Sequence, residues 1–206
     1  MVQKIAGVDV SRETMAELQI FADLVVKWTP KINLIARGSV AAIWDRHIAD
    51  SVQIYHYTPE TYLKWVDIGS GGGFPGIVIA ILAKTRHPAA KIILIESDQR
   101  KAVFLRAAVR DLKLNASVLA ERVEDADPQG ADVVSARSLS ALSGLLPLVD
   151  RHLKSDGLAI LHKGKRAHDE ISQARQSWSF TLEQHASFTD PEARILAIQR
   201  MSQLGR

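Results

Sequence analysis

Glycines gather in one short stretch of the chain, where the residues from Trp65 to Gly76 read W-V-D-I-G-S-G-G-G-F-P-G. Five of the chain's twelve glycines lie between residues 69 and 76. An apolar run over residues 65–68 predicts a buried strand before them, and residues 77–83 predict a buried helix after them. A glycine loop between a strand and a helix lets the backbone approach a nucleotide-like ligand closely.

Two classes of ligand compete for this loop. The spacing Gly71-x-Gly73-x-x-Gly76 formally fits the dinucleotide fingerprint. In that fingerprint, however, the first glycine follows the strand directly and the pyrophosphate lies on the helix N-terminus. Here Gly69 follows the strand, and counting from it places Phe74 where the third glycine belongs.

Acidic residues mark the ends of the first two expected strands. Asp67 places a carboxylate beside the loop, which would repel a pyrophosphate and suit a ligand with a sulfonium and an amino group. Glu96 ends the strand over residues 92–95, where it can accept hydrogen bonds from both ribose hydroxyls. Together they favour S-adenosylmethionine over NAD. A glycine-rich turn without a ligand is the remaining interpretation, although so many glycines in one loop are entropically costly.

The composition bounds the other functions. The chain has 206 residues, is 47% hydrophobic and contains no cysteine, which excludes disulfides, thiolate zinc sites and cysteine nucleophiles. No cluster of His, Asp and Glu has ligand spacing, so we expect no metal. A net charge of +3 is compatible with an RNA partner without demonstrating one. The first ten residues lack the apolar core of a signal peptide, and no apolar run approaches the roughly 18 residues of a membrane span, so we expect a cytoplasmic protein.

The first 61 residues predict a helical extension. Ser11 can cap a helix that runs to about residue 28 and that Pro30 ends, and a second helix covers residues 40–55. No strand is expected before residue 62.

Residues 62–206 alternate between strands and helices, which predicts an α/β domain with a largely parallel sheet. The final two strands look like an antiparallel pair joined by Thr189-Asp190-Pro191. The expected strands cover residues 65–68, 92–95, 116–120, 132–136, 158–161, 180–187 and 194–201, and the expected helices cover residues 77–87, 98–112, 139–153 and 168–178. Asp98 is the expected cap of the helix over residues 98–112, whose core face would carry Val103, Leu105, Ala108, Val109 and Leu112.

The stretch D-I-G-S-G-G-G-F-P-G-I, which starts at Asp67, resembles the signature of the RsmG (GidB) family of bacterial small-subunit ribosomal RNA guanine-N7 methyltransferases. The resemblance covers nearly the whole chain. Departures are Thr29-Pro30 after the tryptophan and Ser138 after the arginine, neither of which we expect to touch the cofactor pocket. Other matching segments are Trp28 with Ile32-Asn33-Leu34, Arg46-His47 with Asp50-Ser51, Glu96-Ser97 with Arg100-Lys101 and Phe104-Leu105, Arg122-Val123-Glu124, Ala136-Arg137-Ser138-Leu139, and Lys163-Gly164.

The resemblance implies a class I, Rossmann-like methyltransferase fold of seven strands, with the last pair antiparallel. It implies S-adenosylmethionine as cofactor, S-adenosylhomocysteine as product, and N7 of guanine 527 in 16S rRNA as the target. The partner would be 16S rRNA or the small ribosomal subunit, and we expect a monomer because nothing suggests an obligate dimer. Carried over by position, the family's cofactor contacts are Gly69, Phe74, Val123, Glu124 and Arg137, which join Asp67, Gly71 and Glu96 from the loop and strand ends.

Two alternatives to this function remain open. The first is a methyltransferase that acts on another RNA or on a small molecule. The second is a nucleotide-binding regulatory module without catalysis.

N7 of guanine carries an in-plane lone pair and no proton, so the implied reaction needs no general base, and no catalytic residue is assigned with certainty. Arg137 follows the fourth strand and is the candidate for positioning the base, with a salt bridge as the alternative. We expect Arg46 and Asp50, which share a helix with His47, to tie the extension to the catalytic domain. RNA contact is the second option, with Arg46 and His47 as its candidates. Residues 163–168 form a basic run that predicts a phosphate contact or a solvated loop, with Lys163, Lys165 and Arg166 as candidate RNA ligands.

Overall fold

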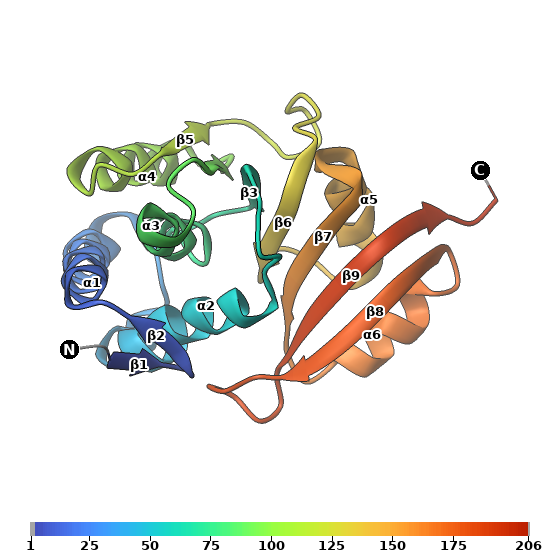
Figure 1. The fold of residues 1–206 in the computed structure, drawn as a ribbon, viewed down its shortest axis with the longest axis horizontal. Helices are drawn as coiled ribbons and strands as arrows, with labels where there is room; N and C mark the ends of the chain where they lie inside the picture. Colours follow the sequence, from blue (N-terminus) through green and yellow to red (C-terminus); the bar gives the residue numbers. More distant parts are fainter. Residues whose placement is uncertain (1–2, 206) are drawn as a thin grey trace.

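A seven-stranded sheet forms the centre of the protein in a computed structural model that describes residues 3–205 (Figure 1). The strand order is β5-β4-β3-β6-β7-β9-β8, in which the first five strands are parallel and β9 is antiparallel to both of its neighbours. This arrangement confirms the expected mixed sheet. The strands are β3 (Lys64–Ile68), β4 (Lys91–Ile95), β5 (Ala116–Leu119), β6 (Ala131–Arg137), β7 (Leu153–Lys163), β8 (Trp178–Ala186) and β9 (Arg194–Gln203).

Helices cover both faces of the sheet, as a parallel sheet with two apolar faces requires (Figure 1). The helices α1 (Arg12–Ile32), α3 (Gly76–Arg86) and α4 (Gln99–Asp111) pack on one face, and α5 (Leu142–His152) and α6 (Ala167–Ala174) pack on the other. Alternate residues of β3 enter the two cores: Trp65 faces the first and Val66 the second. Among residues 3–205, no helix is long and apolar enough to cross a membrane.

The helix α4 begins at the predicted cap, where the Asp98 carboxylate accepts hydrogen bonds from the backbone N–H groups of Arg100 and Lys101. Its predicted core face was partly wrong. Val103 is exposed, whereas the neighbouring Phe104 is buried against α1.

The first helix confirms Ser11 as its cap but does not end at Pro30. Proline lacks the N–H that would bond the carbonyl of Val26, and only two helical residues follow it, so little of the hydrogen-bond ladder is lost. The helix ends instead at Asn33, whose φ of 51° is left-handed and whose N–H bonds the carbonyl of Thr29.

The second predicted helix exists as a run of irregular pitch rather than one regular helix. It consists of η1 (Arg37–Ala42), the π-helical η2 (Trp44–Ala49), α2 (Asp50–Val52) and η3 (Gln53–Tyr57). Wide helical turns of this kind are frequent at functional sites. The run carries the R-H-x-x-D-S segment, and the change of pitch sets the directions in which its side chains point.

The expectation of no strand before residue 62 was wrong. A hairpin of β1 (Gln3–Ile5) and β2 (Val8–Val10) turns at Ala6 and Gly7, which both have positive φ. Ile5, Val8 and Val10 belong to the same core as α1 and α3. The extension therefore shares its core with the sheet, and a domain boundary between residues 61 and 62 stays a prediction.

Candidate functional site

A cavity of about 930 Å³ opens at the carboxyl ends of β3, β4 and β6. This volume lies within the range of about 300–1,000 Å³ that is usual for small-molecule sites. Crevices at this edge of an open parallel sheet are where such folds bind ligands. The lining includes residues from separate parts of the chain: Leu34, Ile35, Ala36, His47, Gly69–Gly72, Phe74, Ile95, Glu96, Ser97, Lys101, Arg122–Glu124, Arg137–Ser140, Gly144 and Leu148.

The glycine loop forms one wall because its backbone packs too closely for side chains. Gly69 has a φ of +68°, and a Cβ there would lie 2.6 Å from Cδ1 of Leu139. A Cβ on Gly72 would lie 2.9 Å from the carbonyl oxygen of Leu34. The loop is thus fixed between the segment after β6 and the segment after α1, with its backbone facing the cavity.

The structure does not bring Asp67 to the cavity. Its buried carboxylate lies under the loop, where it accepts hydrogen bonds from Ser135 Oγ (2.7 Å) and from the backbone N–H of Gly76 (3.2 Å). Burial raises the pKa of Asp67 to about 6, and the hydrogen bond from Ser135 opposes that rise. Asp67 holds the loop and the start of α3 together, so the expected repulsion of a pyrophosphate is not exerted by direct contact.

Glu96 lines the cavity at the end of β4, as predicted. Its Oε2 accepts a hydrogen bond from the N–H of Gly71 and its Oε1 accepts one from the N–H of Asp98, both at 2.7 Å. A carboxylate offers about four lone-pair positions, so two remain for ribose hydroxyls. Glu96 also joins the glycine loop to the turn before α4.

Phe74 is buried between the extension and the cavity, and it forms an aromatic floor. Its ring centroid lies 5.2 Å from that of Phe21 and 5.1 Å from that of His47. The guanidinium of Arg137 lies over the same ring, 5.2 Å from the centroid. The predicted contacts Phe74 and Arg137 therefore form one unit.

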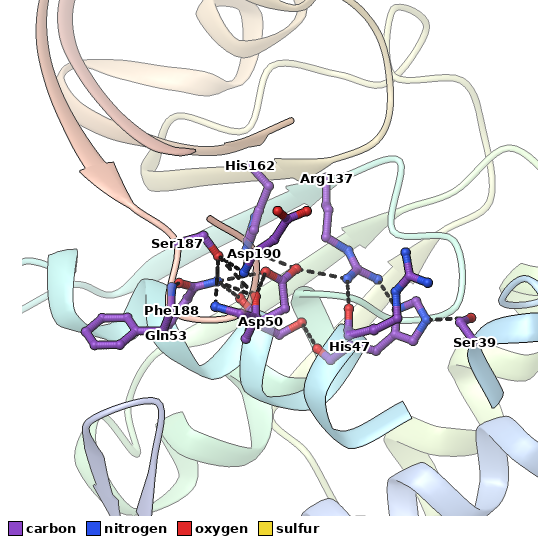
Figure 2. Close-up of polar contacts among 12 residues, drawn as sticks. Ser39, His47, Asp50, Gln53, Arg137, His162, Ser187, Phe188 and Asp190 are labelled. Carbon is purple, nitrogen blue, oxygen red and sulfur yellow. Dashed lines mark hydrogen bonds and ion pairs between the residues drawn. The ribbon is translucent and has the colours of Figure 1, made fainter. Parts of the chain in front are cut away.

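Three groups of the η2 segment and α2 hold the guanidinium of Arg137 (Figure 2). Nη1 donates to the carbonyl of Arg46 (3.0 Å) and to Oδ2 of Asp50 (3.1 Å), and Nη2 donates to Nδ1 of His47 (2.8 Å). Arginine is always a donor, so Nδ1 of His47 is an acceptor and its Nε2–H donates to Ser39 Oγ at 3.0 Å. Burial, and then the charge of Arg137, lower the pKa of His47 to about 4, so the imidazole is neutral.

Val123 and Glu124 line the cavity as predicted, and Val123 is buried. The carboxylate of Glu124 is paired with Arg122 at 2.6 Å on the exposed rim. Val123 therefore supplies apolar surface, and Glu124 supplies a polar edge.

The basic run after β7 divides into two parts. Lys163 is buried, and its ammonium donates to the carbonyl of Ser140 (2.6 Å) and pairs with Glu170 (2.9 Å). Its expected role as a phosphate ligand is corrected to that of an internal brace, because the charge is already neutralised away from solvent. Lys165 and Arg166 are exposed, as is Arg46 on η2.

Sequence reasoning missed several lining residues. Ile35 and Ala36 form a wall together with Leu34, and Lys101 and Leu139 also line the cavity. Leu34, Lys101 and Leu139 lay in matching segments but were given no role at the site. Ser138 does touch the cavity, contrary to expectation, and has a φ of 55°. The small polar residues around it, directly after a strand end, were the available signal. Among the described residues 3–205, no group of three His, Asp or Glu side chains could hold a metal ion.

The strand order, the glycine loop and the acidic end of β4 define a class I S-adenosylmethionine-dependent methyltransferase. The chain belongs to the family described as rRNA small subunit methyltransferase G (GidB), whose model matches residues 14–197.

Named relatives resemble the chain over nearly its full length. A Cereibacter sphaeroides protein is 48% identical over 198 residues, which are 96% of this chain and 96% of that protein. A Ruegeria pomeroyi protein is 46% identical over 96% of this chain and 97% of its own. Both are called ribosomal RNA small subunit methyltransferase G.

Solved structures share the fold at low sequence identity. M. jannaschii TYW2, crystallised with AdoMet, has a TM-score of 0.56 and 14% identity over 82% of this chain and 78% of its own. A SAM-dependent methyltransferase from Aquifex aeolicus has a TM-score of 0.56 and 14% identity over 74% of this chain and 89% of its own.

Proposed function

We propose that this protein transfers a methyl group from S-adenosylmethionine to N7 of guanine 527 in 16S rRNA. One observation carries the proposal: the separate segments that match the family signature converge on one cavity, with Gly69, Phe74, Glu96, Val123 and Arg137 in its lining. The names of the relatives supply the RNA substrate, and the resemblance of the motifs supplies the atom and the position.

The donors and acceptors in the cavity fit this cofactor. Glu96 would accept hydrogen bonds from the ribose hydroxyls, because its carboxylate has unused lone pairs. Val123 and Ile95 offer apolar surface to the adenine, and the backbone of Gly69–Gly72 offers close approach to the remainder. When bound, the cofactor supplies an electrophilic methyl group on a sulfonium.

The chain's own contribution is orientation rather than proton transfer. Guanine N7 has a free lone pair, so no residue must remove a proton before the attack. Alignment of two reactants can contribute on the order of 7–11 kcal/mol to lowering the barrier. Arg137 uses three of its five N–H groups within the protein, which leaves two to donate to the cofactor carboxylate or to O6 beside N7 of the guanine.

Arg46, Lys165 and Arg166 are the proposed phosphate contacts, since they are exposed at the edge where the cavity opens. Neutralising all three should weaken RNA binding and reduce the slope of log K against log salt, because fewer counterions are released. An unchanged slope would mean that these three residues do not contact the RNA phosphates. We propose 16S rRNA or the small subunit as the partner. We also propose that the enzyme is a monomer and that it acts in the cytoplasm.

Methyl transfer to 16S rRNA from a strain that lacks this modification tests the proposal. The product should carry N7-methylguanine at position 527, which chemical cleavage at that base reveals. Transfer of the methyl group to another base, to another RNA or to a small molecule would show that the proposed substrate is wrong. A protein that S-adenosylmethionine stabilises against heat but that transfers no methyl group would instead be a binding module.

A further inference from the structure

Asp50 lies where three parts of the fold meet (Figure 2). Its Oδ2 accepts the hydrogen bond from Arg137 at the end of β6. Its Oδ1 accepts hydrogen bonds from Gln53 Nε2 (2.7 Å) and Thr189 Oγ1 (2.8 Å), and its carbonyl accepts one from His162 Nε2 (2.9 Å). The side chain is only 15% exposed, so these contacts are largely shielded from water.

The turn between β8 and β9 is fixed by the same segment. Gln53 accepts a hydrogen bond from the N–H of Phe188 (2.8 Å) and donates one to Ser187 Oγ (3.1 Å). Strand β9 starts opposite the end of β7, because Arg194 pairs with Lys163. The turn therefore lies at the carboxyl edge of the parallel strands, the edge at which the cavity opens, and Figure 1 shows it beside α2.

Arg137 is held at this edge through both of its terminal nitrogens. Asp50 and the carbonyl of Arg46 bind Nη1, and His47 binds Nη2, so the guanidinium is held over the ring of Phe74. Of these partners, only Asp50 carries a full negative charge. A charge-assisted hydrogen bond is about twice as strong as a neutral one, so the carboxylate dominates the orientation.

We propose that Asp50 is the positioning residue for Arg137, and that its second oxygen makes the β8–β9 turn part of the same rigid unit. The proposal rests on the proposed function, because it assigns Arg137 to the ligands in the cavity. An RNA that docks against the turn would then meet an arginine already aligned with the cofactor. Asp50 itself is not among the residues that line the cavity, so it would act on the ligands through Arg137.

A purely structural role for Asp50 makes a different prediction. If Asp50 only fastened the N-terminal extension to the sheet, its removal would lower stability and leave the kinetics of the folded fraction unchanged. Asp132 supplies a matched control, because its 22%-exposed carboxylate pairs with Lys154 at 2.7 Å and accepts the backbone N–H groups of Leu63 and Lys64. Asp132 lies at the opposite end of β6 from Arg137.

The test measures S-adenosylmethionine affinity by calorimetry and methyl transfer to unmodified 16S rRNA. Asp50→Asn should lower kcat/KM for RNA about 10-fold, which corresponds to about 1.4 kcal/mol, and should weaken cofactor binding. Asp132→Asn should lower the melting temperature and leave both quantities within twofold. If the two variants behave alike in both assays, the proposal is wrong.

A double-mutant cycle separates positioning from general loosening. The single ammonium group of Arg137→Lys cannot bind Asp50 and His47 as the guanidinium does. Adding Asp50→Asn to this variant should therefore lower its activity little further. Fully additive losses would overturn the proposal. Thr189→Val serves if Asp50→Asn folds poorly, because it removes the hydrogen bond between the turn and Asp50, together with the contacts of the same hydroxyl to Ser187 (3.0 Å) and Gln53 (3.4 Å). We expect lower kcat with unchanged cofactor affinity, and unchanged kcat would contradict the link to the turn. A wild-type protein that methylates no 16S rRNA would instead refute the proposed function.

Discussion

Ser135→Ala tests the buried chain of hydrogen bonds beneath the glycine loop. Trp65 Nε1 donates to Ser135 Oγ at 2.8 Å, and Ser135 Oγ donates to Oδ1 of Asp67 at 2.7 Å. All three side chains are buried. The register explains the contact, because Asp67 and Ser135 are paired across β3 and β6. Removal of the hydroxyl leaves the indole N–H without its acceptor and the carboxylate without a donor.

The two losses set the magnitude. A hydrogen bond to a charged group contributes about 1.5–3 kcal/mol, and a buried donor left unsatisfied costs about 1–3 kcal/mol. We therefore expect the free energy of unfolding to fall by about 3 kcal/mol at pH 8, where Asp67 is ionised. For a chain of this size, that is a drop of roughly 6–12 °C in Tm.

The effect should depend on pH. The folded pKa of Asp67, about 6, lies above its ordinary value of 3.8, so the native state binds more protons and loses stability through this group as pH rises from about 4 to 6. Loss of the Ser135 donor raises the folded pKa further and extends that decline to higher pH. At pH 5 the carboxyl is already largely protonated in the native state, and the variant should lose about half as much stability.

Urea unfolding at pH 5 and pH 8, with the carboxyl titration of Asp67 followed by NMR, measures both quantities. Ser179→Ala is the control, because this serine is exposed on β8 and should lose almost nothing. Equal losses for Ser135→Ala at the two pH values would refute the reasoning. So would an Asp67 pKa that does not rise in the variant.

Three further changes test other parts of the site. Glu96→Gln places an amide N–H against the N–H of Gly71 or Asp98, so we expect a loss of about 1–3 kcal/mol in stability by urea unfolding and weaker S-adenosylmethionine binding by calorimetry. Gly72→Ala puts a Cβ 2.9 Å from the carbonyl oxygen of Leu34, which must shift that wall and lower cofactor affinity, whereas Gly164→Ala meets nothing within 4 Å and should bind normally. His47→Asn removes a group whose folded pKa, about 4, lies below its ordinary value of 6.5. Wild-type stability therefore falls as the pH drops from about 6.5 to 4, because the unfolded state binds a proton at His47 more readily. The free energy of unfolding of the variant should fall less steeply over this range. Asp67 acts in the opposite direction over part of that range, so the difference between the two proteins is the quantity to compare. Identical pH dependence would mean that burial and the charge of Arg137 do not hold His47 neutral.

The parallel sheet was predictable from sequence because each signal was local. Apolar runs between turn residues marked the strands, and Asp98 marked the start of α4 before any contact was known. The hairpin of β1 and β2 was missed because its strands have three residues each. Such strands are too short to show a clear alternation of apolar and polar residues. Pro30 was misread because its effect depends on how much helix follows it.

The cavity was only partly predictable because the sequence around a charged residue does not show whether its side chain is buried. Lys163 and the exposed Lys165 look alike in sequence, yet Lys163 meets Glu170 only because β7 leads into α6 with that side chain turned inward. Asp67 likewise looked like a ligand for the cofactor, and its partner Ser135 comes from the neighbouring strand. Asp50 was expected to tie the extension to the sheet, and its hydrogen bonds to Arg137 and Thr189 confirm that.

The three carboxylates around the cavity all hold the framework together, including Glu96, which we also propose as the ribose ligand. Asp67 holds the loop to α3, Glu96 holds it to the turn before α4, and Asp50 holds Arg137 to the β8–β9 turn. Each carboxylate is buried or nearly so and accepts hydrogen bonds from backbone N–H groups or from other side chains. A reaction that needs no proton removed depends on alignment, and in this chain the acidic residues serve alignment by fixing the elements that surround the cavity.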